Sequence, residues 1–595
     1  MGSTGNPPAI AGTPSPEPGD PGDRSLEAAG GRVGGAPTPR LSHPRGPHTP
    51  IQSRRARRSD RDRGSTELGP FRQPQSWLTS GRVPESRIIG IDLGTTNSCA
   101  AVVEGEDRKV KLIPYRGGEY TIPSIYAVDE KGNELVGHDA KRQWQLNPRN
   151  TIYGSKRLMG REYDASTLNR IHDYFMYSIH HDDGSHDMLV EVGGIRYGLP
   201  QVASKVLQKI RDVAADYLQQ PIHRAVVTVP AYFNDRQRQA VKEAGAIIGL
   251  DVLRVINEPT AAALAFGVGR SLQKELIAIY DLGGGTFDIS IIEIRDRIFE
   301  VKATGGDIFL GGVDFDNRII EWVLDEFEKA HPGVDLKKDP IAMQRIKDLA
   351  ERSKVDLTDR KECAFNIPFI TMTPEGQPLD IDLRLTRDIL EGRTGDLVDE
   401  TIKTCRGVCT DAGIDPNDVD HVLLVGGMTR MPRVQRAVTD LFGKSPSKQV
   451  NPDEAVAIGA AMFAYSLEDN SDLKVQLLDV IPIAIGIENA RGEFHEIFPR
   501  NASVPNLRQM TFTTSVDGQE DLQMRIYQGD AQVAAHNELL GEFTFSGIRV
   551  ANAGDVRVQV DFSLTQDGIL AMSARDKDTH TEMKTSVKLG QRKYT

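Results

Sequence analysis

The chain has 595 residues, which exceeds the length of one typical domain and predicts at least two. Apolar residues make up 39% of it, enough for hydrophobic cores, and the formal charge of −12 argues against general nucleic-acid binding. No apolar run approaches the roughly 20 residues of a membrane helix, so we expect neither nucleic acid nor membrane as a partner.

The first 86 residues are rich in Pro, Gly, Ser and Arg and predict a disordered arm. The basic cluster Arg54-Arg55-Ala56-Arg57-Arg58 lies in this arm, but an apolar signal-peptide core is missing. Acidic residues and frequent prolines weigh against a mitochondrial transit peptide. A disordered tail, or an upstream start site read as coding, explains the arm better than a nucleic-acid role.

A strand-and-turn signature then occurs twice. Residues 87–91 run into DLGTTN, which begins at Asp92, and residues 276–280 run into DLGGGTFD, which begins at Asp281. In such a turn, glycines let backbone N–H groups approach a phosphate, the Asp can hold magnesium through water, and the Thr hydroxyl can bond a phosphate oxygen. Neither copy is a Walker loop or a dinucleotide-binding motif. One copy alone would be a strand with a glycine turn, whereas two copies favour a site that grips a nucleotide from both sides.

Strands and helices alternate up to about residue 467, which predicts an α/β domain. The expected strands are residues 225–229, 251–256 and 421–425, and the expected helices are residues 236–248, 261–265, 345–357 and 455–463. Pro259 and Thr260 fit the start of one helix, and the sequence NPDE from Asn451 fits the start of another.

The next segment is polar over residues 468–474 and apolar over residues 475–479. Linkers are normally polar, so this one indicates either a segment that docks into a groove of the protein or the first strand of the next domain. From Val480 onward apolar and polar residues alternate, and Asp567-Gly568 predicts a hairpin. We expect a β-sandwich over residues 480–590 and a short tail over residues 591–595.

The four cysteines are too few and too scattered for a disulfide framework. Reduced thiols explain them best, and a metal site at the close pair is a distant second; they are Cys99, Cys363, Cys405 and Cys409.

Seven segments occur in order between about residue 88 and residue 588: IDLGTTNSC, VTVPAYFNDRQRQA, INEPTAAALAFG, DLGGGTFD, GGVDFD, LLVGGMTRMP and NPDEAVAIGAA. They resemble the seventy-kilodalton heat-shock chaperones of the DnaK type. The resemblance implies a duplicated actin-like α/β ATPase domain over residues 87–467, a linker over residues 468–479, and an all-β peptide-binding sandwich. The family's helical lid after the sandwich is not expected here.

The resemblance also implies ATP and Mg²⁺ as cofactors, with K⁺ as a further candidate, and a set of site residues. Those expected to bind ATP are Gly94, Thr95, Thr96, Asn97, Gly284, Gly285, Thr286, Glu351, Lys354, Thr358, Gly427, Met428, Thr429, Arg430 and Asp453. Those expected around Mg²⁺, mainly through water, are Asp92, Glu258, Asp281 and Asp288. Lys156 is expected to face the γ-phosphate and help place the attacking water, and completes the catalytic set with Asp92, Glu258, Asp281 and Thr286.

Taken alone, Lys156 would be a surface lysine paired with a carboxylate, and Glu258 an acid favoured at a helix N-terminus. Two positions depart from the family: Met428 stands where a small polar residue is usual, and Val355 replaces an arginine that some members stack on adenine.

In the second domain the resemblance places Ile487, Phe512, Leu522 and Met524 in a central peptide pocket, with Ala490 and Ser515 in an arch over the peptide. Leu522 stands where valine is common, which predicts a shallower pocket for smaller aliphatic side chains. The alternative is that these apolar residues belong to the core.

The leading hypothesis is a cytoplasmic, ATP-hydrolysing chaperone that captures and releases extended segments of unfolded proteins. Arg254, Leu477, Leu478 and Asp479 are expected to couple the two domains, and a J-domain co-chaperone and a nucleotide-exchange factor are expected partners. The runner-up is a nucleotide-gated scaffold that refolds nothing. A sugar kinase would leave the predicted β-sandwich unexplained.

Overall fold

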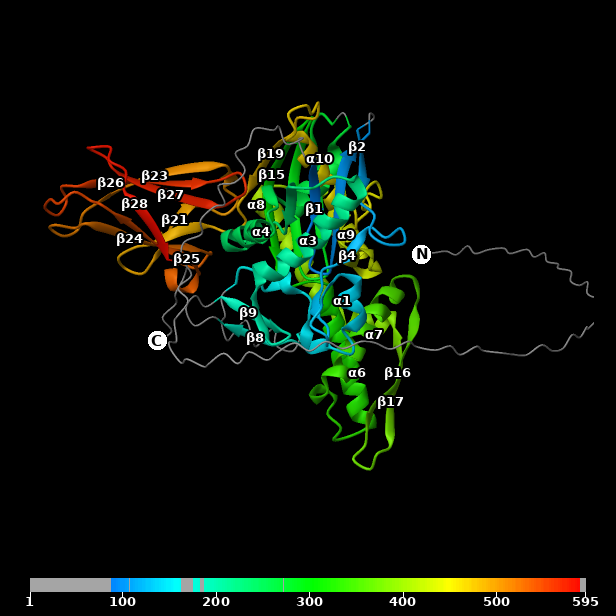
Figure 1. The fold of residues 1–595 in the computed structure, drawn as a ribbon. Coiled ribbons are helices and arrows are strands. Elements are labelled where there is room, and N and C mark those ends of the chain that lie inside the picture. Colours follow the sequence, from blue (N-terminus) through cyan, green and yellow to red (C-terminus); the bar gives the residue numbers. More distant parts are fainter. Residues whose placement is uncertain (1–86, 106–107, 162–174, 182–186, 271, 589–595) are drawn as a thin grey trace, which may run out of the picture. The chain divides into compact units, whose positions relative to one another are not determined.

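The computed structural model describes residues 87–105, 108–161, 175–181, 187–270 and 272–588 (Figure 1). The predicted N-terminal arm and C-terminal tail lie outside these residues. Among the helices described, none combines the length and the apolar character needed to cross a membrane.

Two mixed sheets carry the two turn signatures. In the first sheet β1 (Ile88–Asp92) lies parallel to β11 (Arg224–Val229) and antiparallel to β2 (Asn97–Glu104). In the second, β13 (Glu275–Leu282) lies parallel to β18 (His421–Val425) and antiparallel to β14 (Phe287–Arg295). The equivalent pairing puts both signatures at the carboxyl ends of equivalent strands. We call the parts built on these sheets the first and the second lobe.

The first sheet has the order β12-β11-β1-β2-β3, with β4 paired to β2, and the second has the order β18-β13-β14-β15-β19-β22. The remaining strands of the lobes are β3 (Lys109–Leu112), β4 (Thr121–Pro123), β5 (Tyr126–Val128), β6 (Glu134–Val136), β7 (Thr151–Ile152), β8 (Ile179–His181), β9 (Met188–Val192), β10 (Ile195–Gly198), β12 (Asp251–Asn257), β15 (Ile298–Asp307), β16 (Glu362–Met372) and β17 (Pro378–Thr386).

The helices of the two lobes are α1 (His138–Gln143), α3 (Leu199–Leu218), α4 (Asp235–Ile247), α5 (Glu258–Gly267), α6 (Gly312–Ala330), α7 (Pro340–Asp359), α8 (Arg387–Ala412), α9 (Pro432–Phe442) and α10 (Ala455–Ser466). Figure 1 shows α6 and α7 beside the hairpin β16–β17 of the second lobe. Pro259 lies in the first turn of α5, as predicted, and α4 begins with a capping box formed by Asn234 and Gln237. The predicted NPDE cap does not form through a side chain: the N-cap residue of α10 is Glu454, and the N–H of Ala455 donates to the carbonyl of Asn451.

Helices α5 and α10 lie between the two sheets, in one hydrophobic cluster that takes residues from both. Both helices are apolar on all sides, as expected for helices buried in a large core. Their small residues permit a very close approach. A Cβ atom added to Gly459 of α10 would lie 1.7 Å from the backbone oxygen of Ala261 in α5.

The apolar linker forms strand β19 (Gln476–Val480) of the second sheet. It pairs in parallel with β15 of the second lobe and, at its end, with β22 (Ser503–Val504), which follows it in the chain. Leu477 packs against the cluster around α5 and α10. The strand therefore docks on one domain and leads into the next.

Beyond the linker, two antiparallel sheets face each other across one hydrophobic cluster that takes residues from both. One sheet has the order β21-β20-β24-β25-β28 and the other the order β23-β26-β27. The alternation read from the sequence appears as alternating burial in β26. Their strands are β20 (Ile485–Glu488), β21 (Phe494–Phe498), β23 (Asn506–Thr513), β24 (Asp521–Gln528), β25 (Glu538–Ser546), β26 (Arg557–Leu564), β27 (Leu570–Asp576) and β28 (Lys584–Lys588).

We expect Gly459→Ala to destabilise the protein by about 1–3 kcal/mol, because α10 must move away from α5 to admit a methyl group. A helical Gly→Ala change normally stabilises by up to about 1 kcal/mol, so the sign of the effect is the test. Gly407→Ala in α8 is the matched control, since a Cβ there meets no atom within 4 Å. Thermal unfolding should show a lower Tm for the first variant and an unchanged or higher Tm for the second. Equal Tm changes would contradict the close approach.

Candidate functional site

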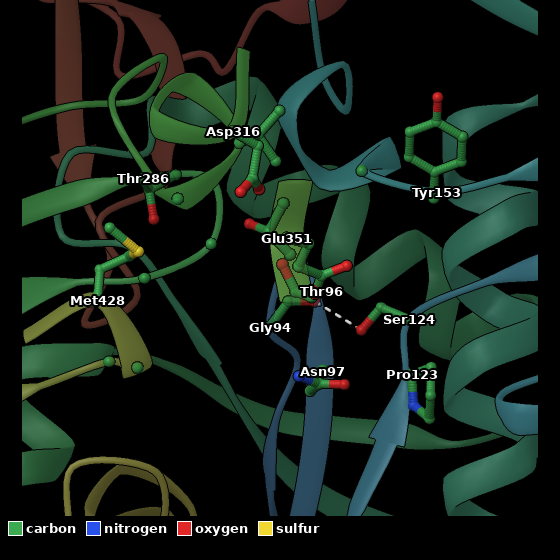
Figure 2. Close-up of a pocket in the computed structure, with 18 of the residues that line it drawn as sticks. Gly94, Thr96, Asn97, Pro123, Ser124, Tyr153, Thr286, Asp316, Glu351 and Met428 are labelled. Carbon is green, nitrogen blue, oxygen red and sulfur yellow. Dashed lines mark hydrogen bonds between the residues drawn. The ribbon is translucent and has the colours of Figure 1, made fainter. Parts of the chain in front are cut away.

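A cavity of about 530 Å³ lies between the lobes and brings both turn signatures together (Figure 2). In that view Thr286 and Met428 lie on one side and Ser124 and Tyr153 on the other, with Thr96 and Glu351 between. The predicted ATP-binding residues that line it are Gly94, Thr95, Thr96, Asn97, Gly284, Thr286, Glu351, Lys354, Thr358, Gly427, Met428, Arg430 and Asp453. Gly285 and Thr429 are not among the lining residues; Thr429 is buried, and its hydroxyl donates to the carbonyl of Gly426.

The two signatures touch each other through their turns. A Cβ atom added to Gly284 would lie 1.9 Å from Oγ1 of Thr96, and one added to Gly285 would lie 2.4 Å from Cγ2 of Thr95. Only glycine permits this approach. The second turn is also fixed from α6, where the N–H groups of Gly312 and Val313 donate to the carbonyls of Gly283 and Gly284 at 2.9 Å.

The first turn is held by a short loop that follows β4. The hydroxyl of Ser124 donates to the carbonyl of Gly94 at 2.8 Å, and the N–H of Ser124 donates to the carbonyl of Thr96 at 2.8 Å. Ser124 therefore fixes the backbone of this turn from the side opposite the second lobe. Sequence reasoning missed it because an isolated serine carries no pattern.

Four carboxylates gather near these turns with one lysine among them. Lys156 and Glu258 are both buried, and the Lys156 ammonium donates to Oε1 of Glu258 at 2.6 Å. The alternative prediction for Lys156 was a surface lysine paired with a carboxylate. The structure shows the pair, but inside the protein rather than on its surface. Asp92 and Asp281 line the cavity, whereas Asp288 lies behind it, accepts the N–H of Tyr232, and keeps Oδ2 buried without a hydrogen-bond partner.

Burial controls the protonation of these acids. It raises the pKa of Asp92 to about 7; Glu258 raises this pKa further, and Lys156 opposes the shift. Burial, reinforced by Glu258, raises the pKa of Asp288 to about 8, and the pKa of Asp281 lies well above its ordinary range for the same reasons. One lysine does not neutralise four carboxylates, so the site is suited to a further cation.

The donor set fits a hydrated magnesium ion better than a directly bound metal. Within the described residues no group of three or more His, Cys, Asp or Glu side chains could ligate a metal directly. Mg²⁺ commonly keeps several of its waters and takes few protein ligands, and the orphaned Asp288 oxygen offers an acceptor for such a water.

The far end of the cavity is formed by α7 and by the turn after β18. Glu351, Lys354 and Thr358 lie on one face of α7, as predicted. The Lys354 ammonium donates to the carbonyl of Gly312 and to Asp316, both at 2.9 Å. Burial raises the pKa of Asp316 to about 6, against the pull of Lys354.

The two family departures lie at this end. Met428 is buried and packs beside Gly312, where an added Cβ would lie 3.1 Å from the Met428 sulfur. Val355 lines the cavity but remains 61% exposed. Arg430 pairs with Asp453 at 2.7 Å and borders the opening. A thioether therefore occupies space that a short polar side chain would leave open.

Another missed residue is Arg157, which follows Lys156 in the short 3-10 helix Ser155–Arg157. Its side chain is 1% exposed; its Nε donates to the carbonyl of Gly285 at 2.9 Å, and its Nη2 lies 2.5 Å from Asp314. Arg157 thus joins the first lobe to the second turn and to α6. An arginine beside a lysine gives no sign of burial in the sequence.

One predicted coupling residue, Arg254, contacts the β-domain through an acid that sequence reasoning used only as a turn signal. Asp567, in the β26–β27 hairpin, accepts from Nε of Arg254 at 2.8 Å and pairs with Lys242. Asp479 of the linker accepts from Asn257 at 2.8 Å and from Thr260 at 3.0 Å. The linker and the hairpin are therefore held by neighbouring residues of β12 and α5.

Four of the predicted peptide-pocket residues belong to the cluster between the two β-sheets. Ile487 and Met524 are buried, and Phe512 and Leu522 are partly buried against it. The predicted arch residues Ala490 and Ser515 are exposed. These positions agree with the alternative that the apolar four contribute to the core, and the predicted pocket stays a prediction.

We expect Asp92→Asn to raise the Tm of the ligand-free protein at pH 8 and to change it little at pH 5. A carboxyl whose pKa is raised contributes stability that is present below about pH 4 and is lost as the pH rises through about 7. Asparagine stays neutral throughout, so its advantage should grow with pH. Asp415→Asn, at an exposed acid, is the control and should show no such growth. An Asp92→Asn effect that is independent of pH would contradict the shift.

The chain was also compared with known protein families. The family model described as Hsp70 protein matches it from residue 88 to residue 594. This match spans both lobes, the linker and the β-domain, and includes every cavity residue named above. Members of this family are chaperone-type ATPases. The chain therefore belongs to the Hsp70 family.

Proposed function

We propose that this cavity binds ATP with Mg²⁺ and hydrolyses it by attack of water on the γ-phosphate. The observation that carries the proposal is the contact between two Gly/Thr turns beside a buried Lys156–Glu258 pair. Backbone N–H groups in such turns suit phosphate oxygens, and the lysine offers the one ammonium next to the acids. The face of α7 that carries Glu351 and Lys354 would hold the adenosine.

The proposed chemistry depends on position and charge rather than on covalent catalysis. Lys156 would place its ammonium against the γ-phosphate, where it offsets charge that develops as the phosphoryl group leaves. Glu258 holds that ammonium in place, and Thr286 offers a hydroxyl to a phosphate oxygen. Asp92, Asp281 and Asp288 would hold Mg²⁺ through its waters, and the ion would supply further positive charge at the phosphates.

We also propose that residues 87–467 form the family's duplicated actin-like ATPase domain and that residues 480–590 form a sandwich that binds extended hydrophobic segments of unfolded proteins. The equivalent pairing of β1 and β13 supports the first assignment. The contact of β19 with both domains supports coupling through the linker. A J-domain co-chaperone, an exchange factor and a cytoplasmic location remain predictions.

Lys156→Ala should reduce steady-state ATP turnover by roughly 10²–10³, the usual effect of removing one transition-state charge contact. MgADP affinity should fall far less, because most proposed nucleotide contacts come from the turns and α7. Lys403→Ala is the control, since this lysine is 77% exposed and pairs only at the surface with Glu400. Phosphate release measured with a coupled assay decides the matter. Turnover within twofold of wild type would rule out the proposed role.

Replacing Leu477 and Leu478 together by Asp should leave basal ATP turnover intact and abolish its stimulation by an unfolded peptide. The aspartates would remove β19 from its apolar contact, and the cavity residues would keep theirs. Gln476→Asp, at the exposed start of the same strand, is the matched control and should keep the stimulation. Undiminished stimulation in the double variant would show that β19 does not couple the domains.

A further inference from the structure

The loop between β15 and α6 belongs to the second lobe but packs against the first. Its residues Ile308 and Phe309 lie against the hydrophobic cluster of the first lobe, whereas the next residue, Leu310, is buried in the cluster of the second. At the start of the loop, the N–H of Phe309 donates to the Asp307 carboxylate at 2.7 Å. It therefore joins the two lobes beside the cavity.

Two arginines of the first lobe lie over the Phe309 ring. The guanidinium carbon of Arg161 lies 4.2 Å from the ring centroid, and that of Arg157 lies 6.0 Å from it. Both distances are within cation–π range, and the shorter one is typical of a stacked arginine. Arg157 is also neutralised by Asp314, so its position does not depend on the ring.

The same loop ends at the second phosphate-binding turn. A Cβ atom added to Gly311 would lie 2.6 Å from backbone atoms of Gly285, and Gly312 donates its N–H to the carbonyl of Gly283. Arg157 reaches this turn from the other lobe through the carbonyl of Gly285. The second turn is therefore held by the loop that carries Phe309 and by Arg157 of the first lobe, which also lies over the Phe309 ring.

We infer that Phe309 is a positioning residue that latches the second phosphate-binding turn to the first lobe and so sets the rate at which nucleotide leaves. Nucleotide release requires the lobes to separate, and separation exposes the Phe309 ring and breaks its contact with Arg161. The inference rests on the proposed nucleotide site and adds to it a control of residence time. The latch does not touch the phosphates, so the hydrolysis step itself is unaffected.

The test is the release of a fluorescent ADP analogue from the full chain, chased with excess ATP in a stopped-flow instrument. Phe309→Ala should speed release by about tenfold, as expected for loss of a partly buried cation–π contact. Arg161→Ala should have a similar effect, and the double variant should release no more than about twofold faster than either single variant. Phe309→Tyr, which keeps the ring, should restore slow release, and single-turnover hydrolysis should stay within about twofold in every variant.

Phe365→Leu is the control for a general loss of stability, because Phe365 is fully buried in the second lobe away from the contact. It should lower the Tm without changing release. Additive effects of the two single variants, or release from Phe309→Ala and Arg161→Ala at the wild-type rate, would overturn the latch. If Phe309→Ala does not fold, Arg161→Ala and Phe309→Leu decide the question by the same measurement. Failure of the wild-type chain to bind the analogue would refute the proposed nucleotide site, and the latch with it.

Discussion

The structure depends on one electrostatic constraint: four carboxylates share a buried region, and among the described residues Lys156 forms an ion pair with one of them, Glu258. Burying carboxylates without neutralisation is costly, and burial raises the pKa values of three of the four, Asp92, Asp281 and Asp288. These acids therefore hold protons near neutral pH, which a cation can displace. This shortage of positive charge favours binding of a cation, because the cation would supply the charge that the acids lack.

The fold also requires segments of backbone to approach one another closely, and glycine residues permit this approach. Gly284 and Gly285 let the two turns touch, Gly311 lets α6 begin against the second turn, and Gly459 lets α10 lie against α5. Since α5 begins at Glu258, the helix packing in the core fixes the acid that holds Lys156. Asn257 and Thr260, at the same helix start, hold the linker through Asp479. The Lys156–Glu258 pair and the linker are thus anchored on one helix end, which gives the proposed coupling a short physical route.

The sequence was sufficient for the parts with a local signal. Local sequence patterns located α4, α7 and β18, and the repeated Asp–Gly–Thr turns located the two walls where the lobes meet. The rest of the predicted lining came from the resemblance to the family. Contacts between distant segments gave no such signal. The fold alone brings three further residues to the cavity: Ser124, Arg157 and Asp316. From the sequence, Asp567 was recognised only as part of a hairpin turn. The role of Phe309 could not be predicted from the sequence either, because its partner Arg161 is distant in the chain and lies in the other lobe.

The most direct test of the central claim is proton release on binding of MgATP, or of a non-hydrolysable analogue with Mg²⁺. Isothermal titration calorimetry at pH 7, in buffers of different ionisation enthalpy, counts the protons exchanged. Because burial raises the pKa of Asp92 to about 7 and that of Asp288 to about 8, binding of the cation should release on the order of one proton per site. Binding with no proton exchange, or with proton uptake, would show that the acids are already ionised and would contradict this account.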